Sequence, residues 1–470
     1  MGGSRRQLKL GAFLYTPGSH SAGWRHPDAV PETDMEFAWY VHMARTAERG
    51  LIDCVFFQDT AAVSGSANLD GAGAVRPRVS RQVYLEPVSL IAALAAVTEN
   101  IGLVSTATTT YAEPYDLARR FATIDHISGG RAGWNLVTSQ VEDEAEISAP
   151  NGTWNTGCAT SGPAIWDVVT SLWDSWEDGA LLRNKASGTY IDGTKLHFQH
   201  HQGKHFKVRG PLNLPRTPQG RPVVSEAGSS EAGKELAART ADLVFTAQTV
   251  LEEGKAFYDD VKARAVRHGR HPDDVKILPG LMTIVGRTEA EAQEKLASLQ
   301  ALISDEAAMR LLARLCGDLD IHAFPIDGPL PPLPPSNAAK ARQQLIVDLA
   351  RKEKLSIRQV ARYLGTSLGH QLQVGTPAMI ADRMQEWLEA GACDGFNLMF
   401  PHFPKPLEDF VDMVVPELQR RGIYRTAYEG RRCGRTLASR CRGTATPRRE
   451  RIAGTLRKCL LVPPQRHGRT

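Results

Sequence analysis

Apolar and polar positions alternate along the chain in blocks, and these blocks predict strands that are each followed by a helix. Short apolar runs, several rich in Val, Ile and Phe, have the length and composition of buried strands. Segments in which apolar residues return every three or four positions predict helices. The predicted strands are 8–15, 54–57, 101–110, 132–137, 222–226, 242–246, 276–285 and 395–400; the predicted helices are 35–49, 86–100, 117–126, 231–239, 250–268, 289–304 and 406–420.

Repeated strand–helix units are typical of a parallel sheet. Several predicted strands end in polar residues, and the carboxyl ends of the strands are where a TIM barrel builds its site. We therefore expect an α/β fold, a (β/α)8 TIM barrel with insertions; a doubly wound sheet is the second choice. Residues 1–430 are expected to form this single domain, with an insertion at about 305–370 that holds a helix, a Pro-rich linker and further helices.

The stretch 121–140 supplies one polar strand end. Its helix is expected to end at the turn SGGR (128–131), because glycine adopts positive φ angles without steric cost. An apolar strand follows, and three polar side chains lie in it or directly after it: Asn135, Thr138 and Ser139. We expect these amide and hydroxyl groups at the mouth of the barrel; the alternative is a buried strand with a polar exit.

A later strand leads into the segment AGSSEAG at 227–233. Small residues expose backbone N–H groups, the dipole of the following helix points at the turn, and the hydroxyls of Ser229 and Ser230 can donate. Late strands of such barrels often bind phosphate. The segment lacks the GxGxxG and Walker spacings. We expect a phosphate cradle here; the alternative is a well-capped helix.

Asp59 follows the strand 54–57 and is expected as a lone carboxylate at the barrel mouth, as a base, a metal ligand or a polar anchor for a heterocycle. Thr106 and Thr108 alternate onto one face of their strand. No metal site is predicted, because no second acid or histidine clusters near Asp59 in the sequence. No GxSxG or Cys–His pairing predicts a nucleophile, so no catalytic residue is named. Three scattered histidines are expected to be structural: His20, His26 and His126.

The formal charge of +4 is unevenly distributed. Residues 431–470 contain twelve Lys and Arg against one Glu, so residues 1–430 carry a net charge of −7. A basic tail can bind nucleic acid, but this one has no aromatic residue and no amphipathic period, so no nucleic-acid partner is expected.

The seven cysteines show no CxxC and no zinc spacing. Cys54, Cys316 and Cys393 lie in apolar surroundings and are expected to be buried. No apolar run is long enough to span a membrane, and the segment LKLGAFLY near the N-terminus is interpreted as a strand rather than a signal peptide. We therefore expect a cytoplasmic protein with no membrane partner.

Beyond these patterns, the chain resembles a known family. The matching stretches run in order from about residue 8 to 430: GWRHP, VFFQDTAAV, TTTYAEPYDLARRFATIDHISGGRAGWNLVTS, LWDSWEDGAL, HFKVRGPLNLPRTPQGRPVVSEAGSSEAG, FTAQ, VGTPAMIADRMQEW and DGFNLMFPHFP. They are similar to the bacterial-luciferase-like flavin monooxygenases, in the branch of nitrilotriacetate monooxygenase component A and dibenzothiophene-sulfone monooxygenase.

The resemblance implies a TIM barrel that binds reduced FMN (FMNH2) supplied by a separate flavin reductase and that oxidises a small xenobiotic, sulfur- or amine-bearing substrate with O2. It implies a homo-oligomer, a dimer or tetramer. By the same analogy, Asp59 and Thr106 would contact the region of the flavin ring. Ser229 and Ser230 would hold the phosphate, and three further residues would line the pocket: Asn135, Thr138 and Ser139.

Two segments depart from the family pattern. Where the family continues NFG…H…RY…RA, residues 147–164 read ISAPNGTWNTGCATSGPA, so the family's His and Tyr fall at Thr156 and Thr160 and the expected amphipathic helix becomes a loop. One codon assignment of this segment, read with one base added in front, gives NFGTERHLEHGVRYERAR. The tail from about residue 431 recovers family-like text in the same way. We interpret both as frameshift products, with a disordered tail; a clean gene sequence in the printed frame would contradict this.

Two alternative functions follow from these departures and from the fold. One is a catalytically impaired family member with weak or no flavin binding, because the altered segment 147–164 lacks the family's His and Tyr. The other is a relative that transfers hydride with a deazaflavin; the stretches WRHP and GWNLVTS argue against it.

Overall fold

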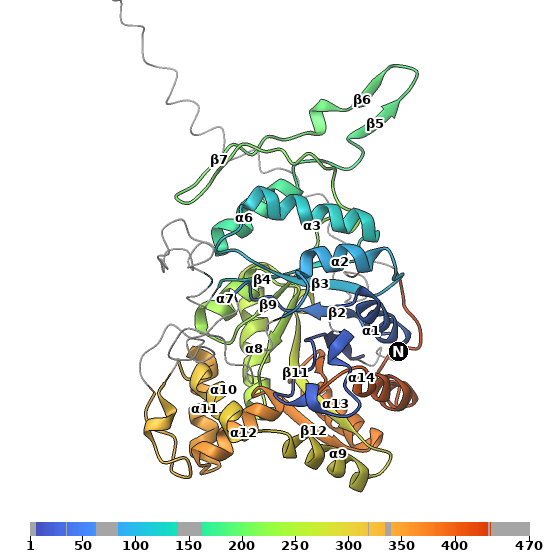
Figure 1. Ribbon diagram of the computed structural model, residues 1–470. Coiled ribbons are helices and arrows are strands. Elements are labelled where there is room, and N and C mark those ends of the chain that lie inside the picture. Colours follow the sequence, from blue (N-terminus) through green and yellow to red (C-terminus); the bar gives the residue numbers. More distant parts are fainter. Residues whose placement is uncertain are drawn as a thin grey trace, which may run out of the picture.

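Parallel strands close into a barrel at the centre of the computed structural model (Figure 1). The structure describes residues 6–33, 35–62, 83–139, 144, 162–317, 319–333, 340–430 and 433. In barrel order from the first strand along the sheet, the eight staves formed by these residues are β1 (Lys9–Phe13), β2 (Cys54–Phe57), β3 (Gly102–Thr108), β4 (Ala132–Val137), β9 (Val223–Ala227), β10 (Leu243–Thr246), β11 (Lys276–Val285) and β13 (Gly395–Met399).

The closure of the sheet decides between the two folds that the sequence left open. β13 pairs with β1, and β10 pairs with β11, with Leu243 opposite Lys276 and Thr246 opposite Pro279. A doubly wound sheet would keep two open edges, so that alternative is wrong and the (β/α)8 barrel is confirmed. Every predicted strand is a stave of this barrel, with bounds that differ by at most a few residues.

Helices cover the outside of the barrel (Figure 1). Their bounds are α1 (Phe37–Arg49), α2 (Pro87–Ala95), α3 (Pro114–Ser128), α6 (Gly162–Trp173), α7 (Glu231–Thr240), α8 (Leu251–Arg267), α9 (Glu289–Ala301), α13 (Pro377–Glu389), α14 (Lys405–Asp409) and α15 (Val415–Arg420). Short 3-10 turns are η1 (Gly23–Arg25), η2 (Pro31–Thr33), η4 (Gly193–Lys195), η5 (Pro272–Asp274) and η6 (Ile321–Ala323).

Four predicted helices differ from the structure, and α6 and α13 were not predicted. The one predicted at 117–126 is longer, since α3 runs from Pro114 to Ser128. Those predicted at 86–100 and 289–304 end earlier, at Ala95 and Ala301. The one predicted at 406–420 is interrupted by a π-helical turn, η7 (Phe410–Val414). Pro416 lies at the start of α15 and has no N–H to donate, which accounts for the locally wider turn before it.

Two apolar layers hold the barrel together. The larger one lies between the staves and the helices and includes the fully buried side chains of Trp134, Trp173 and Trp387. The smaller one fills the barrel, with residues such as Phe56, Val104, Leu278 and Met399. The predicted burial of three cysteines is confirmed: Cys54, Cys316 and Cys393.

Cys433 is also buried and packs in the smaller apolar layer. Its backbone N–H donates to the carbonyl oxygen of Gly130 over 2.9 Å, so this one residue of the predicted tail lies against the base of the barrel. The rest of that predicted tail lies outside the described residues, as do Thr156 and Thr160. The loop predicted for 147–164 is wrong at its end, because Gly162 opens helix α6.

The insertion forms a small helical unit with its own core beside the barrel (Figure 1). Its helices are α10 (Asp305–Leu315), α11 (Lys340–Lys352) and α12 (Ile357–Ser367). The strand that follows, β12 (Gln371–Gly375), pairs with residues 281–285 of β11 and was not predicted. Its sequence QLQVG alternates polar and apolar residues, so a period-two signal was available, although it extends over only four side chains.

A second unpredicted feature is an arm, residues 181–209, which projects away from the barrel above α3 and α6 (Figure 1). It consists of two small antiparallel sheets, β5 (Leu181–Asn184) with β6 (Thr189–Ile191), and β7 (His201–Gln202) with β8 (Lys207–Val208).

No helix in the described part of the chain is long and apolar enough to cross a membrane.

Candidate active site

A pocket of about 650 Å³ opens at the carboxyl ends of four neighbouring staves, β2, β3, β4 and β9. The residues after β2 form one wall, the residues after β4 form a second, and the first turn of α7 forms a third. Six of the seven predicted site residues line it: Asp59, Thr106, Asn135, Thr138, Ser139 and Ser230. Segments as far apart as residues 59 and 230 therefore meet here, as the barrel prediction required.

Ser229 is the predicted residue that does not line the pocket. Its hydroxyl oxygen instead lies 3.0 Å from Thr246 Oγ1, at the end of the next stave, β10. The two serines of the predicted cradle thus have different surroundings, because successive residues of an extended segment point to opposite sides.

A ladder of polar side chains crosses the floor of the pocket. Asn135 Nδ2 donates to Thr106 Oγ1 over 2.8 Å, and Thr106 in turn donates to the carbonyl oxygen of Phe57 over 2.9 Å. Thr108 and Ser139 share a hydrogen bond of 2.7 Å between their hydroxyls. Asn135 Oδ1 is buried and has no hydrogen-bond partner among the described residues. An acceptor of this kind is free to take an N–H from a ligand.

The N-terminus of α7 faces the same pocket. Ser230 caps the helix, since its hydroxyl oxygen accepts from the backbone N–H of Gly233 over 3.1 Å. The remaining N–H groups of a first helical turn have no acceptor within the helix and point outward. Ser230 can therefore cap the helix and also belong to a phosphate cradle. Its oxygen accepts the cap hydrogen bond, and its hydroxyl proton remains to be donated.

The side chains around the predicted phosphate cradle carry little net charge. Glu231 lies in the first turn of α7, but its carboxylate pairs with Lys234 Nζ at 2.5 Å and Arg264 Nη2 at 2.6 Å. No Lys, Arg or His is among the described residues that line the pocket. An anion at this place would be held by helix N–H groups and hydroxyls alone.

Two acids line the pocket with raised pKa values. Burial raises the pKa of Asp59 to about 6, and the nearby carboxylates of Glu86 and Glu144 raise it further. Burial raises the pKa of Glu226 to about 8. The carboxyl of Glu226 is hydrogen-bonded to the hydroxyl of Thr240, which also donates to the carbonyl oxygen of Leu236 over 2.7 Å.

Glu226 and Glu144 are pocket residues that the sequence did not single out. Glu226 is the penultimate residue of β9, so its position at a strand end could have identified it as a site residue. No sequence pattern marked Glu144 as one. The described residues hold no group of three His, Cys, Asp or Glu side chains arranged to bind a metal ion.

The three scattered histidines lie outside the pocket. His20 Nδ1 accepts from the backbone N–H of Ala22 over 3.2 Å, and His126 Nε2 lies 3.1 Å from the carbonyl oxygen of Pro215. The His26 ring stacks on the ring of His402, with centroids 4.4 Å apart. These contacts agree with the structural roles expected for the three residues.

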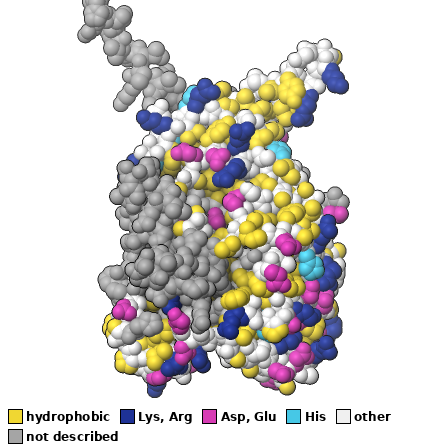
Figure 2. Space-filling model, in the orientation of Figure 1, with side chains coloured by type: hydrophobic (Ala, Val, Ile, Leu, Met, Phe, Trp, Pro, Cys, Tyr) yellow, Lys and Arg dark blue, Asp and Glu magenta, His cyan; other side chains and the backbone are white. Residues whose placement is uncertain are grey.

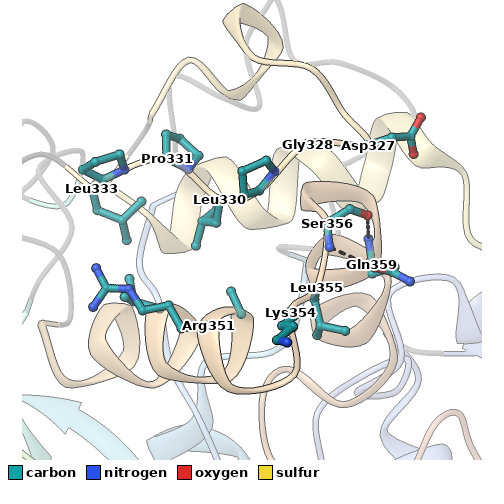
Figure 3. Close-up of a pocket in the computed structure, with 14 residues that line it drawn as sticks. Asp327, Gly328, Leu330, Pro331, Leu333, Arg351, Lys354, Leu355, Ser356 and Gln359 are labelled. Atoms are coloured by element: carbon teal, nitrogen blue, oxygen red, sulfur yellow. Dashed lines mark hydrogen bonds between the residues drawn. The ribbon is translucent and has the colours of Figure 1, made fainter.

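A second pocket of about 590 Å³ lies in the insertion (Figure 3). The segment from Asp327 to Leu333 runs over α11 and the start of α12, and Ser356 and Gln359 at its edge are bonded to each other in a capping box. None of the predicted site residues lines it. The pocket at the strand ends is therefore the candidate active site.

Known proteins similar to this chain in sequence and fold identify its family. The model of the luciferase-like monooxygenase family matches residues 16–394. Nitrilotriacetate monooxygenase component A of Aminobacter aminovorans is 48% identical over 436 residues, 91% of this chain and 95% of that protein. Dibenzothiophene-sulfone monooxygenase of Rhodococcus erythropolis is 37% identical over 441 residues, 91% of this chain and 95% of that protein.

Among solved structures, riboflavin lyase with modified FMN and its substrate riboflavin matches with a TM-score of 0.81 at 29% identity, over 93% of this chain and 96% of that one. The protein therefore belongs to the luciferase-like monooxygenase family, as its sequence resemblance predicted. It is a flavin-dependent monooxygenase, and the cofactor used in this family is reduced flavin.

Proposed function

We propose that the protein is the oxygenase of a two-component system, which takes reduced FMN from a separate flavin reductase and uses O2 to oxidise a small organic substrate. The observation that carries the proposal is the joining of two features in one pocket. A capped helix N-terminus suited to a phosphate lies beside a floor of amide and hydroxyl groups suited to a polar heterocycle.

The residues present fit FMN in three respects. The first turn of α7 and the hydroxyl of Ser230 offer donors to a phosphate. The orphaned Asn135 Oδ1 offers an acceptor to a ring N–H, with Thr106 holding the amide in place. Asp59 is a further acceptor at the rim when it is ionised. These are the roles proposed for the six predicted site residues that line the pocket, with Thr138 and Ser139 as wall residues.

When bound, reduced flavin would supply the redox chemistry by reacting with O2. The chain supplies the pocket that surrounds it. The pocket residues orient the ring by hydrogen bonds from one side, through Asn135 and Thr106. The apolar layer inside the barrel lies below this floor and excludes water from it. No acid–base residue is assigned to the chemistry, and none was predicted.

The substrate class and the partner are proposed from the relatives. One relative is named for nitrilotriacetate, an amine, and another for a sulfone. We infer a small amine- or sulfur-containing substrate. The name "component A" of the first relative supports a separate reductase. We place the reaction in the cytoplasm.

A catalytically impaired protein is not favoured. Six of the seven predicted residues still line one pocket, and the seventh, Ser229, lies between two residues that line it, Gly228 and Ser230. The positions Thr156 and Thr160, where the family's His and Tyr are expected, lie outside the described residues.

We also propose that the protein is a homo-oligomer in which the arm contacts a second copy. The arm exposes large apolar side chains, with Leu182 47% and Tyr190 61% exposed. An isolated two-stranded hairpin is only marginally stable in water. Residues 181–209 carry a net charge of +5, whereas the rest of residues 1–430 carries −12, so the arm is complementary in charge to the body of another copy. Figure 2 shows apolar and basic side chains on the arm.

The experiment that tests the main proposal is an anaerobic titration with reduced FMN. It is made on the unaltered protein and on a variant in which residues 147–164 are replaced by NFGTERHLEHGVRYERAR. Micromolar binding by both supports the proposal for this chain, and O2-dependent turnover should then require NADH plus an added flavin reductase. Binding by neither protein would overturn it, and binding by the restored protein alone would favour the impaired alternative.

A further inference from the structure

The rim segment, residues 58–61, follows β2 and lines the pocket over its whole length. It lies outside the strands and helices. Among the described residues, the backbone of Asp59, Thr60 and Ala61 makes no hydrogen bond to another backbone group. A segment without such bonds opens easily unless side chains hold it. The Asp59 carboxyl therefore needs a restraint from elsewhere if it is to meet a ligand at one place.

Two side chains supply this restraint. The Tyr84 hydroxyl donates to the carbonyl oxygen of Thr60 over 2.9 Å, and the backbone N–H of Ala61 donates to Glu144 Oε1 over 3.0 Å. Burial raises the pKa of Tyr84 to about 12, so the hydroxyl keeps the proton that it donates. Glu144 is 7% exposed, and a hydrogen bond in such a place is strengthened by the low local dielectric. The two backbone groups that follow Asp59 are thus held from two distant parts of the chain.

Glu144 also acts on the Asp59 carboxyl through its charge. Burial is the largest cause of the raised pKa of Asp59, and the carboxylates of Glu86 and Glu144 raise it further. Glu86 lies at the N-cap of α2, where its carboxylate accepts two backbone N–H groups of the first turn. Tyr84, the other titratable neighbour, stays uncharged over the working range of pH. Removal of the Glu144 charge alone should therefore lower the pKa of Asp59.

We propose that Tyr84 and Glu144 are positioning residues, which hold the rim segment so that the Asp59 carboxylate can accept a hydrogen bond from the bound flavin. The inference rests on the proposed function, since it requires a flavin in the pocket. A hydrogen bond to a charged acceptor contributes more than one to a neutral acceptor, but only at good geometry. The restraint of Thr60 and Ala61 provides that geometry, and neither positioning residue has to touch the flavin.

The first test is Tyr84→Phe, which removes one hydroxyl and releases the Thr60 carbonyl. Anaerobic titration at pH 8, where Asp59 is charged, should show reduced FMN binding weakened by up to about tenfold. Tyr428→Phe is the matched control. It loses a hydrogen bond of the same kind, from its hydroxyl to the carbonyl oxygen of Ile52 over 2.7 Å, away from the pocket. The control should bind the flavin as the unaltered protein does.

The second test is Glu144→Gln, which keeps an oxygen to accept from Ala61 and removes the charge. Binding by the unaltered protein should weaken as the pH falls through about 6, where Asp59 takes up a proton. In the variant this loss should begin at a lower pH. Glu144→Gln should therefore bind reduced FMN more tightly than the unaltered protein at pH 6 and equally at pH 8. A merely structural role of Glu144 would not move the pH at which binding weakens.

Both changes are then repeated in Asp59→Asn as double-mutant cycles. They should lose most of their effect there, because they act through the Asp59 carboxyl. Equal effects with and without that carboxyl would overturn the inference, and so would unchanged binding by Tyr84→Phe at pH 8. These outcomes leave the proposed function standing, since the unaltered protein still binds the flavin. If the unaltered protein does not bind reduced FMN, the proposed function and the inference are both wrong.

Discussion

At the residue scale, the pocket holds two carboxyl groups, Asp59 and Glu226, in surroundings that disfavour their charged forms. Burial raises both pKa values, to about 6 for Asp59 and about 8 for Glu226. The Thr240 hydroxyl donates to Glu226 Oε1, which by itself lowers the pKa of Glu226, but the effect of burial is larger. A neutral Glu226 leaves less negative charge beside a site for phosphate.

We predict that Asp59→Asn changes how flavin affinity depends on pH. As the pH falls through 6, Asp59 takes up a proton and loses acceptor capacity, so reduced FMN should bind the unaltered protein less well. The amide of the variant does not titrate. The measurement is the ratio of the two dissociation constants between pH 5 and pH 8, which cancels the titrations of the flavin itself. A ratio that stays constant over this range would show that Asp59 does not bind the flavin.

Glu226→Gln is expected to change the pH dependence of stability. An unfolded Glu loses its proton near pH 4.5, whereas Glu226 in the folded protein keeps its proton up to about pH 8. The folded protein therefore loses stability as the pH rises from 4.5 to 8, and above 8 the loss is complete. The permanently neutral variant should melt at a higher temperature than the unaltered protein at pH 8, and at about the same temperature at pH 4.5.

Thermal melts of the two proteins across this pH range make the measurement. Glu231→Gln serves as the control, since the Glu231 side chain is 74% exposed and lies at the start of the following helix, α7. The melting temperatures of Glu226→Gln and the unaltered protein should move apart as the pH rises. A difference that does not grow with pH would contradict an uncharged Glu226.

At the scale of elements, α7 combines a structural and a binding role at one end. Ser230 satisfies the N–H of Gly233, and the same first turn faces the pocket. The local sequence predicted this element well, because a small-residue turn followed by a Ser cap is a short-range signal. Strand β12 alternates over only four side chains, and the strands of the arm have two to four residues each, so neither gave a clear period.

Ser230→Ala is predicted to have two separable effects. Loss of the cap should lower the free energy of unfolding by about 0.5–2 kcal/mol. Loss of a donor should weaken reduced FMN binding about tenfold and leave riboflavin binding unchanged. Thr288→Ala is the matched control, because Thr288 caps α9 through Glu291 N at 3.2 Å and lies away from the pocket.

Urea unfolding and flavin titrations of both variants give the answer. We expect both to lose stability and Ser230→Ala alone to lose FMN affinity. Equal FMN binding by the two variants would mean that α7 is only a capped helix.

At the scale of the whole molecule, the arm is the part that the barrel does not account for. It projects from the helical layer (Figure 1), and Phe198, 48% exposed, adds to its apolar surface. The described residues of the chain offer this surface no apolar cover along the hairpin, whose residues 182–191 are all exposed. Contact with a second copy would bury it.

We predict that the double variant Leu182→Ser/Tyr190→Ser dissociates into monomers under conditions in which the unaltered protein is a dimer or tetramer. High salt should also favour monomers, because the proposed contact joins a basic arm to an acidic body. Light scattering after gel filtration measures the mass. Val266→Ser, at a 54% exposed apolar side chain on α8, is the control and should leave the mass unchanged. A monomeric unaltered protein, or an oligomeric double variant, would refute the role of the arm.

The sequence by itself determined the elements of the barrel and the chemistry of its strand ends. Apolar period, turn glycines and helix caps are local properties, so they located every stave and placed amide and hydroxyl groups at Asn135, Thr138 and Ser139. The family resemblance, carried by stretches spread along the chain, added the flavin and the monooxygenase activity.

Only the tertiary structure decided how these elements meet. Closure, which includes the pairing of β1 with β13, excluded the open sheet, because pairing between strands far apart in sequence leaves no local mark. The structure turned Ser229 toward Thr246 and away from the pocket, and it buried Glu226, which raises the pKa of that carboxyl. Burial and hydrogen-bond direction depend on what the rest of the chain places beside a residue. For that reason the sequence named the candidate site residues, while the fold assigned each of them its partners.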